Sequence, residues 1–252
     1  YGRRFFTPMY GKVLRAGIDA VVIAAPDHLH TEFLLEARRL GKPAYVEPPF
    51  SWNWSDWAGR IEDGASPDVQ SFPGCQQFSS PSALRARAWL AEGKIGELQE
   101  IQGDCSGFLG GWSTIPARSD LEERKWNWFL GGELLRPYEP EQFFQWSKFS
   151  HYSRGPALRH LVHLLTAIQT AVDLGEVLEA SAVRSHATEE RTEDHVSTLL
   201  KFSRVPLVSL AGRENRHPLR HLIRLFGEEG EIQFSRDECR LYRRPPLYRS
   251  VS

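Results

Sequence analysis

The chain has 252 residues, of which 41% are hydrophobic and 25% are charged, as in an ordinary globular protein large enough for two modest domains. Its formal net charge of -1 at pH 7 argues against nucleic acid or an anionic membrane surface as the main partner. No stretch has the length of a transmembrane helix and no signal peptide is recognisable, so we expect a cytoplasmic protein.

The cysteines are few and widely spaced. Cys75, Cys105 and Cys239 form no Cys-x-x-Cys pair. Such spacing predicts reduced cysteines rather than a disulfide framework, and it predicts no metal site.

The first third of the chain reads as alternating strands and helices. Residues 20–25 are continuously apolar and rich in β-branched side chains, which is typical of a strand buried on both faces of a parallel sheet. This strand ends at Pro26 and a polar cluster, where open α/β sheets bind ligands. We predict helices at residues 10–16, 30–40 and 52–62 and strands at residues 20–25, 44–46 and 68–72, joined by right-handed crossovers.

The rest of the chain is predicted to form a second sheet covered by helices. The pattern predicts an antiparallel sheet with helices on one face. We predict helices at residues 80–92 and 156–174, strands at residues 96–104, 178–186, 195–202 and 207–213, and a hairpin of residues 222–226 and 231–234.

A long stretch of residues 107–153 is predicted to be irregular and contains four tryptophans: Trp112, Trp126, Trp128 and Trp146. Long aromatic-rich loops in compact domains are often functional. The tryptophans either present a platform for a ligand or simply cover the sheet, and the sequence leaves both interpretations open.

Several short motifs together carry a resemblance to a known family. They lie at residues 19–30, 41–49, 74–81, 93–96, 126–131, 136–138 and 155–163. In this order they resemble the glucose–fructose oxidoreductase, inositol dehydrogenase and MocA-like oxidoreductases. The resemblance implies a partial Rossmann domain of the α/β class over residues 1–78 and an α+β domain over residues 79–252. The latter would be an open-faced, mostly antiparallel sheet that shapes a sugar site and forms a homo-oligomer interface.

The resemblance also implies a cofactor, NAD or NADP, and residues that would bind it. In this family pattern Ala25, Pro26 and His30 line the nicotinamide–ribose region. Glu47 and Pro49 match the first and last positions of a Glu-Lys-Pro motif. Gln76, from the Gln76–Gln77 pair, completes the expected cofactor set.

The same resemblance implies residues for the chemistry on a sugar or polyol. His163 matches a histidine that assists proton transfer at the carbinol, a role suited to a side chain that titrates near neutrality. His160 lies one helical turn away as a second candidate. The expected substrate-contacting residues are Trp112, Trp126, Trp128 and Tyr152.

The chain departs from the family pattern at several positions. No Gly-x-Gly-x-x-Gly occurs in it, and it begins at Tyr1 with Met9 as its single methionine, so we expect a processed or partial chain. Pro48 stands at the motif's lysine, Arg159 at an aspartate four positions before His163, and Phe78 at an arginine. Proline carries neither a charge nor a donor, so it cannot replace the lysine.

Three functions follow as hypotheses. The first is an NAD(P)-dependent oxidoreductase acting on a sugar, polyol or related cyclic alcohol. The second is a non-catalytic homologue that uses its sheet for oligomerisation or a partner, and the third is a sugar-binding module without redox chemistry.

Overall fold

The structure is a computed structural model that describes residues 9–51, 69–108, 120–131, 136–185, 188, 190–205, 207–218 and 220–243. The chain divides into two compact units. Unit 1 comprises Tyr1–Gly74, Gly110–Gly155 and Thr188–Thr192, and unit 2 comprises Cys75–Leu109, Pro156–Ala187 and Glu193–Ser252. The boundary predicted between residues 78 and 79 stays a prediction.

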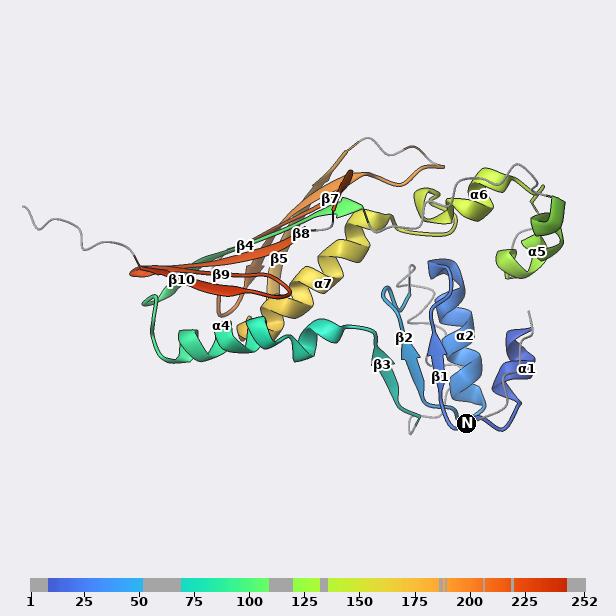
Figure 1. The fold of residues 1–252 in the computed structure, drawn as a ribbon, viewed down its shortest axis with the longest axis horizontal. Coiled ribbons are helices and arrows are strands. Elements are labelled where there is room, and N and C mark those ends of the chain that lie inside the picture. The colour runs from blue at the N-terminus through green and yellow to red at the C-terminus, as the bar shows by residue number, and fades with distance from the viewer. Residues whose placement is uncertain are drawn as a thin grey trace, which may run out of the picture. The chain divides into compact units, whose positions relative to one another are not determined.

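Unit 1 is built on a parallel sheet (Figure 1). The strand order is β1-β2-β3, and both pairs are parallel, as the sequence predicts. The elements of this part are α1 (Tyr10–Leu14), β1 (Val21–Ile23), α2 (Asp27–Arg39), β2 (Ala44–Val46) and β3 (Ser71–Pro73). The helix predicted at residues 52–62 lies outside the described residues.

The core of this sheet lies between its strands and α2. Leu34 and Ala37 of α2 are buried against Ile23, Ala44 and Val46. The prediction that the first strand is buried on both faces is wrong for the described structure, because Val22 is 71% exposed. Helices α1 and α2 pack on the Ile23 face, and Val22 points to the opposite face because side chains alternate along a strand.

The stretch predicted to be irregular contains regular structure, so that prediction is also wrong. It forms α5 (Asp120–Leu130), α6 (Pro140–Phe144) and the short 3-10 helix η2 (Trp146–Lys148). Trp126, Phe129 and Leu130 are buried, and their i, i+3, i+4 spacing is the helical signal that the flanking glycine pairs obscured.

Unit 2 is a seven-stranded sheet in the order β10-β9-β8-β4-β7-β6-β5. Its pairs are antiparallel except β4 with β7, which is parallel, so the expectation of a mostly antiparallel sheet is confirmed. The strands are β4 (Leu98–Phe108), β5 (Val177–Arg184), β6 (His195–Phe202), β7 (Val208–Pro218), β8 (Arg220–Gly227), β9 (Gly230–Phe234) and β10 (Cys239–Arg243).

Helices cover one face of this sheet (Figure 1). They are α4 (Pro81–Ala91) and α7 (Pro156–Ala171), and the short 3-10 helix η1 (Gln76–Ser79) packs against α7. Ser80 caps α4 by accepting a hydrogen bond from the Ala83 amide, and Pro81 occupies the first turn, where its missing N–H is tolerated. Leu164 and Ile168 of α7 are fully buried against the sheet.

Gly103 of β4 lies beneath α7 and beside Leu210 of β7. A Cβ at this position would lie 3.5 Å from Leu164 Cδ1 and 3.6 Å from Ile168 Cδ1, which are ordinary contacts, but only 2.8 Å from Leu210 Cδ2. A side chain here would therefore require Leu210 to shift. None of the described helices is both long and apolar enough to cross a membrane.

Candidate functional site

The expected cofactor residues of unit 1 gather at the carboxyl edge of its sheet. Ala25 and Pro26 follow β1, and Glu47 follows β2, with the Glu47 amide donating to Ile23 O at 3.0 Å. Carboxyl ends of parallel strands form the usual ligand-binding edge of such sheets. The structure therefore brings Ala25, Pro26, Glu47 and Pro49 to one edge.

His30 holds this edge together. Its side chain is buried, with Nε2 2.7 Å from Ala25 O and Nδ1 2.8 Å from Pro49 O. A neutral imidazole donates to only one of these carbonyls, since its other nitrogen is an acceptor. His30 ties the turn after β1 to the turn after β2, and its ring is occupied by these contacts.

The first turn of α2 is anchored to a later part of unit 1. Asp27 is buried and accepts a hydrogen bond from Ser153 Oγ at 2.7 Å, in the position where a helix N-terminus favours a negative charge. His28 Nε2 lies 2.7 Å from Phe129 O, and burial lowers the pKa of His28 to about 4. Sequence reasoning missed both anchors, although the polar pair directly after the strand was a signal.

Gly74 packs directly against Glu47. A Cβ on Gly74 would lie 3.0 Å from the Glu47 Cα. The Gly74 amide donates a hydrogen bond to Val46 O at 2.6 Å. Pro48 is buried beside this contact, and the Pro48–Pro49 peptide is cis. The position that carries a lysine in the family pattern thus presents no charge and no donor here.

The expected substrate residues of unit 1 differ in exposure. Trp126 is 3% exposed in an aromatic cluster, stacked on Phe129 at a centroid distance of 5.2 Å, and its indole N–H donates to Arg136 O at 2.7 Å. Tyr152 is buried in the same cluster and donates to Gln142 Oε1 at 2.8 Å. Trp128 is 51% exposed, and Trp112 lies outside the described residues. Trp126 and Tyr152 are occupied by packing, whereas Trp128 has a free surface.

The expected catalytic histidines lie on α7 in unit 2. His163 is partly buried, and its Nδ1 has no hydrogen-bond partner among the described residues. Burial lowers the pKa of His163, and the positive charges of Arg236 and Arg159 lower it further. These effects favour the neutral ring, and they also make it a weaker base.

His160 is more deeply buried than His163. Burial lowers the pKa of His160 to about 4, with smaller effects from Arg159 and His163. Gln76, the remaining expected cofactor residue, lies in η1 with an exposed side chain. His160, His163 and Gln76 belong to unit 2, whereas the carboxyl edge of the parallel sheet belongs to unit 1.

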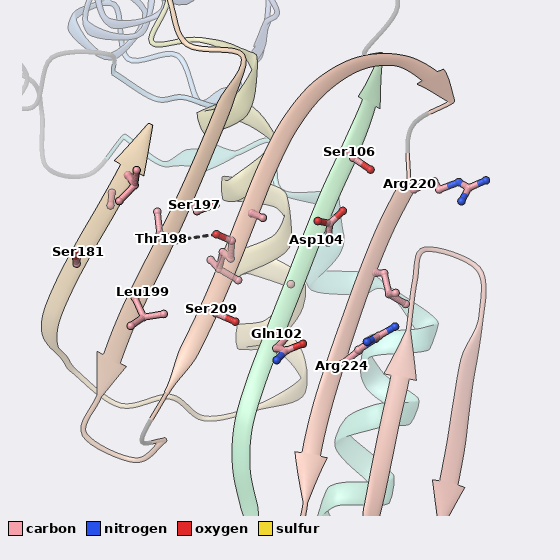
Figure 2. Close-up of a pocket in the computed structure, with 16 residues that line it drawn as sticks. Gln102, Asp104, Ser106, Ser181, Ser197, Thr198, Leu199, Ser209, Arg220 and Arg224 are labelled. Carbon is pink, nitrogen blue, oxygen red and sulfur yellow. Dashed lines mark hydrogen bonds between the residues drawn. The ribbon is translucent and has the colours of Figure 1, made fainter. Parts of the chain in front are cut away.

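The face of the unit 2 sheet opposite the helices is open (Figure 2). It contains a hollow of about 780 Å³ lined by alternate residues of β4, among them Gln102, Asp104 and Ser106. Apolar side chains are exposed on the outer strands, including Val183 at 74%. The predicted open-faced sheet is thus present, and its uncovered face is partly apolar.

Comparisons with known proteins bear on this arrangement. No protein-family model matches the chain. It is 34% identical to inositol 2-dehydrogenase 2 of Saccharopolyspora erythraea over 99 residues, which cover 38% of this chain and 28% of that protein. It is 22% identical to levoglucosan dehydrogenase of Pseudarthrobacter phenanthrenivorans, over 89% of this chain and 58% of that protein.

The fold is similar to that of a solved dehydrogenase structure. Levoglucosan dehydrogenase in complex with NADH and L-sorbose superposes with a TM-score of 0.68 at 20% identity, over 92% of this chain and 59% of that one. The chain spans less than two thirds of the length of these relatives. Sequence relatives and fold together confirm the resemblance to the glucose–fructose oxidoreductase, inositol dehydrogenase and MocA-like oxidoreductases.

Proposed function

We propose that the protein is an NAD(P)-dependent oxidoreductase that acts on a sugar, a polyol or a related cyclic alcohol. The observation that carries this proposal is His163, a neutral histidine on α7 with an unpartnered Nδ1. Relatives named for inositol and levoglucosan support the substrate class.

The residues at the unit 1 edge fit one end of a dinucleotide. Ala25, Pro26 and Glu47 lie where an open parallel sheet binds its ligand, with His30 holding the edge in shape. The chain contains no Gly-x-Gly-x-x-Gly for the pyrophosphate, so these residues would hold only the nicotinamide–ribose end. NAD or NADP, when bound, supplies the acceptor for a hydride.

His163 would act on the hydroxyl of the substrate. Oxidation of an alcohol removes a hydride from the carbinol carbon and a proton from its oxygen, and His163 would take the proton. Trp128, with its half-exposed ring, is the described tryptophan able to stack on a sugar face.

A second candidate function is a non-catalytic homologue, and two substitutions favour it. Pro48 removes the cation expected at the reacting hydroxyl, and Arg159 lowers the pKa of His163 where an aspartate would raise it. Such a protein would keep sugar binding or its partner surface without turnover.

We also propose that the open face of the sheet forms a homo-oligomer. Exposed Val183 and Leu199 lie at the hollow in that face, and such apolar surface is typical of association sites. Pairing of this face with the same face of a second copy would give a symmetric dimer.

Calorimetric titration with NADH and NADPH, followed by oxidation assays with inositol and levoglucosan in the presence of NAD⁺ or NADP⁺, tests the enzyme proposal. We expect binding and turnover, and His163→Gln should lower kcat by about 10²–10⁴-fold without weakening cofactor binding. The matched control His195→Gln changes a histidine of β6 bonded to Ser197 and should retain activity.

The outcomes separate the candidates. Absence of binding at millimolar cofactor would contradict the enzyme proposal. Binding without turnover, with turnover restored by Pro48→Lys combined with Arg159→Asp, would identify a non-catalytic homologue that lost its catalytic charges.

A further inference from the structure

Three side chains far apart in the sequence meet beneath α7. They are Cys105 of β4, His160 of α7 and His221 of β8. One potential ligand atom from each lies within 4.8 Å of those of the other two. The wide spacing of the cysteines predicted no metal site, because it compares neighbours in the sequence and these three are neighbours only in the fold.

The sheet register explains why two of them meet. Cys105 is directly opposite His221 in the antiparallel pairing of β4 with β8, so both side chains point to the same face. Cys105 is fully buried in the core beneath the helices, which identifies that face as the covered one.

The packing of α7 supplies the third side chain. Leu164 contacts the site of Gly103 on β4, and His160 is one helical turn before Leu164, about 6 Å along the helix axis. Cys105 is two residues after Gly103, about 6.6 Å along the strand. The two steps are similar in length, so His160 lies over Cys105. The rings of His160 and His221 are nearly perpendicular, with an interplanar angle of 87°, and their centroids are 6.4 Å apart.

His160 is the observation that points to a ligand. It is 1% exposed, and neither ring nitrogen finds a hydrogen-bond partner among the described residues. Buried polar atoms are nearly always paired, and leaving one unpaired costs about 1–3 kcal/mol. A metal ion would satisfy one of these nitrogens.

We propose that Cys105, His160 and His221 form a binding site for a borderline-soft divalent cation, with Zn²⁺ as the best match. A thiolate with two imidazoles is a donor set that selects such ions over Mg²⁺ or Ca²⁺. Tetrahedral Zn²⁺ would hold the three atoms about 3.3–3.6 Å apart, which requires a contraction of the present cluster by side-chain rotation. Three protein ligands leave the fourth position for water or another small ligand. This site stands independently of the proposed dehydrogenase activity.

Titration of the purified, reduced full chain with Co²⁺ and Zn²⁺ tests the site. We expect one ion per chain, with a thiolate-to-cobalt charge-transfer absorption that Zn²⁺ abolishes by displacement. Cys105→Ser should remove that absorption. It should also weaken Zn²⁺ binding by about 100-fold or more, because loss of a residue that only supports a metal ligand already weakens binding by about 10–100-fold, and Cys105 is a direct ligand.

Two further variants keep the test interpretable. His221→Gln, at a half-buried position, should weaken binding even if Cys105→Ser folds poorly, as circular dichroism would reveal. Cys239→Ser changes a cysteine of β10 outside the cluster and should bind Zn²⁺ as the unmodified chain does. The proposal is overturned if the folded chain shows no thiolate absorption with Co²⁺, or if Cys105→Ser and His221→Gln both bind Zn²⁺ with unchanged affinity.

Discussion

Two buried polar side chains of unit 1, His30 and Asp27, are each tied to specific neighbours. His30 joins two turns through their carbonyl oxygens, and Asp27 is held by Ser153. These side chains lie at the carboxyl edge of the unit 1 sheet, and their polar atoms hold the turns of that edge in place.

His28 gives a pH dependence of stability. Its pKa is about 4 in the native state against about 6.5 in the unfolded chain. Between these pH values the unfolded state holds the extra proton, so the stabilising contribution is complete above pH 6.5 and is lost as the pH falls toward 4. The slope is up to about 1.4 kcal/mol per pH unit.

Urea unfolding of the unmodified chain and of His28→Gln from pH 8 to pH 4 measures this contribution. The variant should be less stable at pH 8, because it lacks the imidazole contact to Phe129 O, and its stability should fall less on acidification. Parallel pH curves for the two proteins would contradict the assignment.

Helix α7 organises unit 2, since it packs on the sheet core and carries both His160 and His163. Leu164 of this helix is fully buried in the core and lies next to Gly103 of β4. We expect Leu164→Ala to reduce the free energy of unfolding by about 2–5 kcal/mol, through lost burial and the cavity left behind.

Equilibrium denaturation measures that loss, and α4 offers the matched control. Leu84 is exposed there, so Leu84→Ala should change stability by no more than about 0.5 kcal/mol. Equal effects of the two substitutions would mean that α7 does not pack on the sheet as described.

Helices and strands with a clear period were predictable from the sequence, whereas contacts across the fold were not. The apolar run before Pro26 and the alternation of residues 195–202 identified their strands because the side-chain period is visible locally. Helix α5 was missed although Trp126, Phe129 and Leu130 have its period. Strand β10 was missed because it has five residues and alternates between apolar and charged residues only over its first three. The meeting of Cys105 with His221 depends on sheet register, which no local pattern records.

The face of the unit 2 sheet opposite the helices is open (Figure 2). It combines the exposed side chains of Val183 and Leu199 with ion pairs such as Arg213–Asp104, whose closest atoms are 3.5 Å apart. Apolar area with a polar surround is what association between copies requires.

Val183→Asp tests that association. A charge on this face should shift the assembly toward the monomer, measured by sedimentation velocity over a range of concentrations, because desolvating an unpaired carboxylate opposes burial. Leu84→Asp places the same charge on α4 and should leave the assembly unchanged. An identical mass for the unmodified chain and Val183→Asp would show that this face does not hold the oligomer together.

The position of β4 has a consequence for how unit 2 acquires its structure. This strand lies between β7 and β8, which are consecutive in the chain, and Ile101 pairs with Val208 more than a hundred residues later. If β7 and β8 closed on each other as a hairpin, which local contacts favour kinetically, they would exclude it. Strand β4 is synthesised before both of its neighbours and remains unpaired until they are made. We expect a β7–β8 hairpin to compete with the native sheet as a misfolded product. Insertion of β4 between the two strands is then the slow step of folding.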